Sequence, residues 1–222
     1  MAVTAALVFA VAAGGTMAAQ RVQSGVLSLG LNAANLAIEW SADGTAESDN
    51  GAITVDESAL MPAGEYDFAK AGNNYSVQNV NGDSNMSAYV RVTVTKYWCD
   101  GNDAQAGKDL EADSGLLTLT CDEENWTSVV NPFEGRTKSE TQVFYYKTPL
   151  APGASTTDLL KSMALSEEAD NQYADKAVRL EAVAEAVQYV PGDNELNEQA
   201  ILSAWGVKAT LNADGSISAI SN

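Results

Sequence analysis

The sequence predicts a mostly β protein, an antiparallel β-sandwich with a few short helices. Several short segments rich in β-branched and aromatic residues alternate between apolar and polar positions. Turns rich in Gly, Pro, Asp and Asn separate these segments, as in sandwich folds. The chain has 222 residues, of which 45% are hydrophobic. This length and composition fit one domain with a packed core.

The strongest predicted strand covers residues 88–98, with the sequence AYVRVTVTKYW. Val90, Val92 and Val94 share one face, and Arg91 lies on the other with the threonines, which is typical of a half-buried strand. We expect Arg91 to form a cross-strand ion pair on the outer face. Further strands are predicted at residues 26–31, 36–40, 52–55, 116–121, 126–130 and 142–147, with one or two within 66–80. Turns are expected at 61–64 and 149–153, and loops at 41–51 and 100–114.

Two later segments have helical composition. Residues 176–190 are rich in Ala, Glu and Leu, which favours a helix. The same segment also has apolar residues at every second position, Val178, Leu180 and Ala182, and this alternation favours a strand. Residues 195–205 are predicted to form a short helix that Asn194 caps and Gly206 ends.

The N-terminus is typical of a secretory signal peptide. Residues 2–13 are apolar and uncharged, and small residues follow them. We therefore assign residues 1–18 to a signal peptide whose basic n-region is missing, with cleavage after Ala18 or Ala19. The alternative is a buried N-terminal helix. The apolar run is shorter than the about 20 residues that span a bilayer. Cleavage would free residues 19–31 ahead of a domain at residues 32–222, and the mature protein is expected to be secreted.

The charge and residue types narrow the possible functions. The chain carries 12 Lys and Arg against 30 Asp and Glu, a net charge of -18. This charge disfavours binding to nucleic acids and to anionic membranes. There is no histidine, which removes the commonest general base and zinc ligand. We predict no catalytic residue, no cofactor and no metal site. A hydrolase using two carboxylates remains an alternative, although the sequence singles out no pair.

The two cysteines, Cys99 and Cys121, suggest a disulfide in an exported chain. The alternative is two buried thiols. The aromatic residues offer a similar choice, because they either form a glycan-binding surface or belong to the core, which strand aromatics do more often. The aromatic residues in question are Trp98, Trp126, Tyr145, Tyr146 and Trp205.

An ordered series of short motifs resembles the TasA/camelysin family, exported matrix-fibre proteins of Gram-positive bacteria. The first of these motifs is the strand segment YVRVTVTK at residues 89–96, and the order of the motifs along the chain carries the resemblance. The other motifs are GTMA at 15–18, SGVLSL at 24–29, MPAG at 61–64, FYY at 144–146, LAPGAST at 150–156, EAVQ at 185–188 and AWG at 204–206.

The resemblance implies a jelly-roll-like sandwich in which residues 176–190 form a strand. It also implies a structural subunit of a biofilm-matrix or surface fibre, with other copies of itself and other matrix proteins as partners. The freed segment would then be donated to the next subunit, with Val22, Val26, Leu27, Leu29 and Leu31 as candidate assembly residues. The alternatives are that this segment folds back on its own domain, or that the protein is a monomeric adhesin or carbohydrate-binding module. The peptidase activity described for camelysins does not carry over, because the chain has no His ligand.

Overall fold

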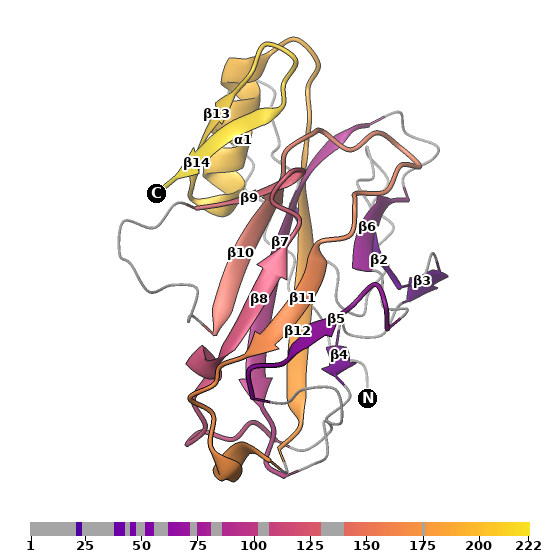
Figure 1. Ribbon diagram of the computed structural model, residues 1–222. Coiled ribbons are helices and arrows are strands. Elements are labelled where there is room, and N and C mark those ends of the chain that lie inside the picture. Colours follow the sequence, from indigo (N-terminus) through magenta and orange to yellow (C-terminus); the bar gives the residue numbers. More distant parts are fainter. Residues whose placement is uncertain are drawn as a thin grey trace, which may run out of the picture.

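The computed structural model describes residues 21–23, 38–42, 45–47, 52–55, 62–71, 75–80, 86–101, 107–129, 140–174 and 176–222, with side chains from residue 62 onward. Within these ranges the chain is mostly β, and the strands form antiparallel sheets packed as a sandwich (Figure 1). This confirms the predicted fold class.

The larger layer is a six-stranded antiparallel sheet. Its central pair consists of β7 (Ala88–Trp98) and β12 (Val178–Gln188), which pair residue for residue over their full length. On the β7 side the sheet continues through β10 (Thr141–Tyr146) to β9 (Trp126–Ser128). On the β12 side lie two short strands, β1 (Arg21–Gln23) and β4 (Ala52–Val55).

The opposing layer is made of two three-stranded sheets. One has β11 (Leu160–Leu165) between β5 (Glu65–Asp67) and β8 (Leu117–Cys121). The other has β2 (Ile38–Ala42) between β3 (Thr45–Glu47) and β6 (Tyr75–Asn79). The segment before β11 links the two sheets, because the amide of Thr156 donates to Val77 O at 2.9 Å and that of Leu159 donates to Tyr75 O at 3.0 Å.

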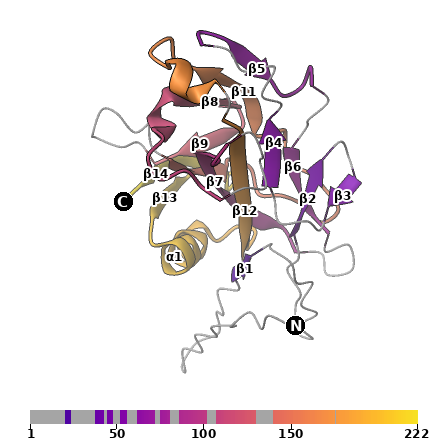
Figure 2. The same ribbon diagram turned by 90° about the horizontal axis from the view of Figure 1, so that it is seen from below.

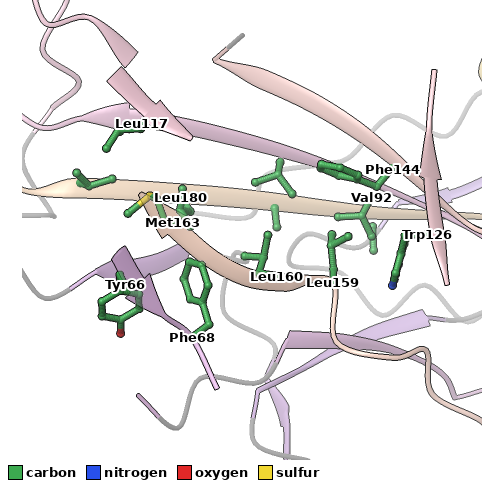
Figure 3. Packing of buried hydrophobic residues seen from close by; sticks show 14 of the residues in the cluster. Tyr66, Phe68, Val92, Leu117, Trp126, Phe144, Leu159, Leu160, Met163 and Leu180 are labelled. Atoms are coloured by element: carbon green, nitrogen blue, oxygen red, sulfur yellow. The ribbon is translucent and has the colours of Figure 1, made fainter. Parts of the chain in front are cut away.

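The first core lies between these layers (Figure 3). The central pair contributes the even-numbered residues of β7 and β12, such as Val92 and Leu180, as the period-two pattern predicts. The opposing layer contributes Phe68, Leu160 and Met163, and all five side chains are buried. Burial of this apolar surface is the main stabilising term for the sandwich.

A C-terminal unit covers one end of the other face of the large sheet. It comprises α1 (Asn194–Trp205) and the hairpin of β13 (Lys208–Leu211) with β14 (Ile217–Ser221), seen at one end of the sheet in Figure 1. Ile201 and Trp205 of α1 pack with Tyr89 of β7 and Tyr145 of β10 in a second core. Gly206 ends the helix in the left-handed conformation, with a φ of 71°.

Most of the described elements follow the sequence-based prediction, with several corrections. Residues 178–188 form a strand, in agreement with the resemblance and against their helical propensity. The predicted helix is present, but its cap is Asp193, whose side chain accepts from the Leu196 amide, and not Asn194. The strands β3, β11, β13 and β14 and the two 3-10 turns, Ser114–Leu116 and Asn171–Tyr173, were not predicted. In the described part of the chain, no helix is long and apolar enough to cross a membrane.

Candidate functional site

The candidate site is the outer edge of β12, the edge that faces away from β7. Two short strands occupy it in antiparallel register: β4 pairs with Val178–Glu181, and β1 pairs with residues 185–187. Figure 2 shows β4 and β1 near different ends of β12. Among the described residues, no strand residue pairs with Ala182, Val183 or Ala184 on this edge.

The faces of β12 are packed on both sides near the β1 end. Ala182, Ala184 and Ala186 face the first core, where each lies opposite a buried valine of β7. On the other face Val187 belongs to the second core beneath α1. With both faces and the β7 edge engaged, the outer edge is the side of β12 that remains for exchangeable pairing.

An ion pair on the outer face fixes the C-terminal unit to this part of the sheet. Nε of Arg91 donates to Oε2 of Glu185 at 2.7 Å, and the second contact comes from Nη2. The guanidinium of Arg91 lies 5.3 Å from the centre of the Trp205 ring, a cation–π distance. Glu185 is register partner to Arg91, so the expected cross-strand ion pair is confirmed. The same Glu185 is register partner to Gln23 of β1 on the outer edge.

The predicted assembly and cleavage residues lie largely outside the described part. Val22 is in β1, opposite Ala186 of the same chain. The predicted signal peptide at 1–18 and most of the segment 19–31 lie outside the described residues. Of the named candidates, this applies to Ala18, Ala19, Val26, Leu27, Leu29 and Leu31. The described part of this segment therefore folds back onto its own domain, which is one of the two arrangements that the sequence left open.

The predicted disulfide between Cys99 and Cys121 is not formed, because neither cysteine is disulfide-bonded in the structure. Cys99 follows β7, near the point where β8 begins, because Trp98 Nε1 donates to the Asp113 carbonyl at 3.0 Å. β8 runs away from this point and ends at Cys121. A strand rises about 3.3 Å per residue, so the length of β8 separates the two cysteines. A disulfide requires Cα atoms within about 7 Å. Burial raises the pKa of the Cys121 thiol to about 12, which keeps it protonated.

The aromatic residues belong to the cores and not to an exposed glycan-binding surface. Trp98 and Trp126 are buried in the first core, with Tyr146 half-buried against Trp126, while Tyr145 and Trp205 pack in the second core. This agrees with the interpretation that the sequence favoured.

In the part of the chain that the structure describes, two carboxylates are buried, those of Glu185 and Asp122, and both make structural contacts. Glu185 accepts from Arg91, while Asp122 accepts from the Thr157 hydroxyl at 2.7 Å and from Asn125 Nδ2 at 2.9 Å. Burial alone would raise the pKa of Asp122, but these hydrogen bonds outweigh burial and lower it. Among the described residues, no group of three or more His, Cys, Asp or Glu side chains is placed to hold a metal ion.

Lys96 is an unusual residue that the sequence analysis missed. It lies on the core-facing side of β7 and is fully buried, and its Nζ donates to the Leu117 carbonyl of β8, so it joins the two layers. Burial lowers the pKa of Lys96 to about 8, although the charge of Asp113 acts in the opposite direction. The alternating pattern of the strand already placed Lys96 on the core-facing side, because Lys96 lies an even number of residues from Val90, Val92 and Val94.

The chain was compared with protein-family models, with curated proteins and with solved structures. No protein-family model, no curated protein and no solved structure matches the chain. The functional assignment therefore depends on the geometry of the described residues and on the sequence motifs.

Proposed function

We propose that the protein is an exported structural subunit of an extracellular fibre, of the biofilm-matrix or surface type made by TasA/camelysin-like proteins, and not an enzyme. Its subunits assemble by donating their N-terminal strand. The observation that supports this proposal most directly is the three-residue β1 strand, which pairs with the outer edge of an eleven-residue strand, β12.

The geometry of this edge is suited to exchange between subunits. β1 consists of Arg21–Gln23, close to the N-terminus that signal cleavage would create, so a neighbouring copy could offer the same segment to the same edge. Pairing with a neighbour preserves the main-chain hydrogen bonds and the side-chain register of the edge. Each subunit would give one strand and accept one. Such head-to-tail contacts do not close on themselves and produce a filament.

The net charge of -18 adds a condition for assembly. Copies of so acidic a chain repel one another at low ionic strength, and salt screens this repulsion within a Debye length of about 10 Å at 0.1 M. We therefore expect the mature chain to polymerise faster at physiological salt than at low salt.

The decisive experiment removes the donated strand. We expect a mature chain lacking residues 19–31 to remain a folded, soluble monomer by size-exclusion chromatography, while the parent chain forms fibres visible by electron microscopy. As a control, a synthetic peptide of residues 19–31 should bind the shortened chain without making it polymerise, because the peptide fills the edge but offers no second domain. Fibres from the shortened chain that are indistinguishable from those of the parent would show that strand donation is wrong.

A further inference from the structure

The outer edge of β12 is divided into two parts by the register of the strands that occupy it. β4 ends its pairing at Glu181, where the partner is Ala52. β1 occupies the other part, with Gln23 opposite Glu185 and Val22 opposite Ala186. Both strands run antiparallel to β12, so they follow one another along the same edge.

We propose that the donated strand fits a short slot, Ala182–Gln188 of β12, in the register of β1, and that β4 closes this slot. In this register the apolar anchors of the donor are Val22 and Val26, and not Leu27, Leu29 and Leu31. The inference rests on the strand donation proposed above and adds to it the register, the length and the side chains that matter.

The first argument comes from the pairing that β1 already makes. If the register continues beyond Gln23 opposite Glu185, Ser24 is set opposite Ala184 and Val26 opposite Ala182. Residues directly opposite one another in an antiparallel pair project from the same face. Ala182, Ala184 and Ala186 all face the first core. A donor in this register therefore turns Val22 and Val26 toward the core.

The second argument explains why the slot ends at Ala182. Continued further, the same register would set Ser28 opposite Leu180 and Gly30 opposite Val178, although these two β12 side chains are 0% and 3% exposed. In that register Leu27 would pair with Glu181 and Leu29 with Arg179, so both leucines would lie on the face away from the first core. β4 instead places Ile53 opposite Leu180 and Val55 opposite Val178. β4 therefore supplies apolar partners where the N-terminal segment would supply a serine and a glycine.

A bulge at Gly25 is the competing arrangement. One extra residue in the donor would move Leu27 to the position opposite Ala182 and bring the leucines to the core side. The two arrangements differ in which residue lies opposite Ala182: Val26 in the continuous register and Leu27 in the bulged one.

Cysteine cross-linking in mixed fibres distinguishes them. The mature full chain, with Cys99 and Cys121 replaced by alanine, is made with either Val26→Cys or Ala182→Cys, so that a disulfide between them can only join two chains. Val22→Cys with Ala186→Cys is the matched positive control, because pair types alternate along an antiparallel ladder and these pairs are of the same type. Leu27→Cys with Ala182→Cys reports the bulge. Mild oxidation and a non-reducing gel give the yields.

We expect the 26–182 pair to cross-link between chains about as well as the 22–186 pair, and at least five-fold better than the 27–182 pair. Fibres in which 22–186 links but 27–182 exceeds 26–182 would overturn the proposed register and leave strand donation intact. Fibres in which none of the three pairs links between chains would overturn strand donation itself. A parent chain that forms no fibres would overturn both proposals.

Charge substitutions give an independent test of the anchors. We expect Val22→Asp and Val26→Asp each to slow polymerisation of the mature chain at least ten-fold, because each places a carboxylate against the first core. Leu29→Asp, beyond the slot, should change the rate less than two-fold. Far-ultraviolet circular dichroism confirms that each variant is folded. Equal slowing by Leu29→Asp would contradict a slot that ends at Ala182.

Discussion

Along one edge β12 pairs with β7 through all of its residues, whereas along the other the described residues provide one strand of four residues and one of three. The β7 edge lies inside the sheet, between two cores. The outer edge is covered by pieces of the N-terminal region that are separated in sequence. Short ladders open at lower free energy than long ones, because fewer hydrogen bonds and less buried surface hold them. The difference suggests that the β7 edge holds the domain together and that the outer edge is available for exchange.

The largest difference in stability between the two edges is expected for the two residues opposite Ala186. These are Val90 on β7 and Val22 on β1. Val90→Asp should destabilise the domain by at least about 4 kcal/mol, because a buried carboxylate would have no partner. Val22→Asp should leave the monomer folded, with a loss below about 1 kcal/mol, because the short strand adds little to the domain. Thermal unfolding followed by circular dichroism measures both. Equal destabilisation by the two variants would show that the edges do not differ.

Glu185 allows the same comparison for a charged residue, with Arg91 on one side and Gln23 on the other. Arg91→Ala should cost about 3 kcal/mol, because it leaves the buried Glu185 carboxylate without its ion-pair partner. Gln23→Ala should cost less than about 0.5 kcal/mol.

Urea unfolding provides the measurement for this pair, and a double-mutant cycle provides the control. The variant Arg91→Ala with Glu185→Ala should be less destabilised than the sum of the two single variants. Strict additivity would mean that the ion pair does not couple the two strands.

The smallest difference in stability is expected for the two residues opposite Leu180. These are Lys96 on β7 and Ile53 on β4. The pKa of Lys96 falls from 10.5 to about 8 on folding, so between these values the unfolded chain binds a proton that the folded chain lacks. Its contribution to stability therefore increases with pH in this window. From pH 8 to pH 9.5 the free energy of unfolding should rise by about 1.5 kcal/mol more in the parent chain than in Lys96→Met, because folded Lys96 is already half deprotonated at pH 8 and each pKa unit corresponds to about 1.4 kcal/mol.

Ile53→Met is the matched control for this experiment, since it changes the other partner of Leu180 without removing a charge. Its pH profile should run parallel to that of the parent chain. Taking the difference between variants cancels the titration of groups common to both, such as Cys121. A parent-minus-Lys96→Met difference that stays constant from pH 8 to pH 9.5 would show that Lys96 does not titrate in this range.

The sequence alone predicted much of the large sheet and little of what surrounds it. The alternation of valines predicted β7 and its core-facing side, and the same alternation placed Arg91 on the opposite face, where a cross-strand ion pair was expected. β11 and the β13–β14 hairpin were missed because their segments alternate weakly and include Ala, Ser and Lys at positions where a strand would be expected to carry β-branched residues. The disulfide was predicted wrongly because the spacing of two cysteines says nothing about the direction of the strand that ends in the second.

The sequence by itself determined the acidic charge, the lack of histidine, the antiparallel β class and the faces of β7. These follow from composition and from a period of two, which are local properties of the chain. Only the tertiary structure decided that residues 178–188 form a strand, that Lys96 is buried, and that β1 and β4 share one edge of β12. Each of these depends on which distant segments become neighbours, because strand pairing and burial are set by contacts far apart in sequence and can override local propensity.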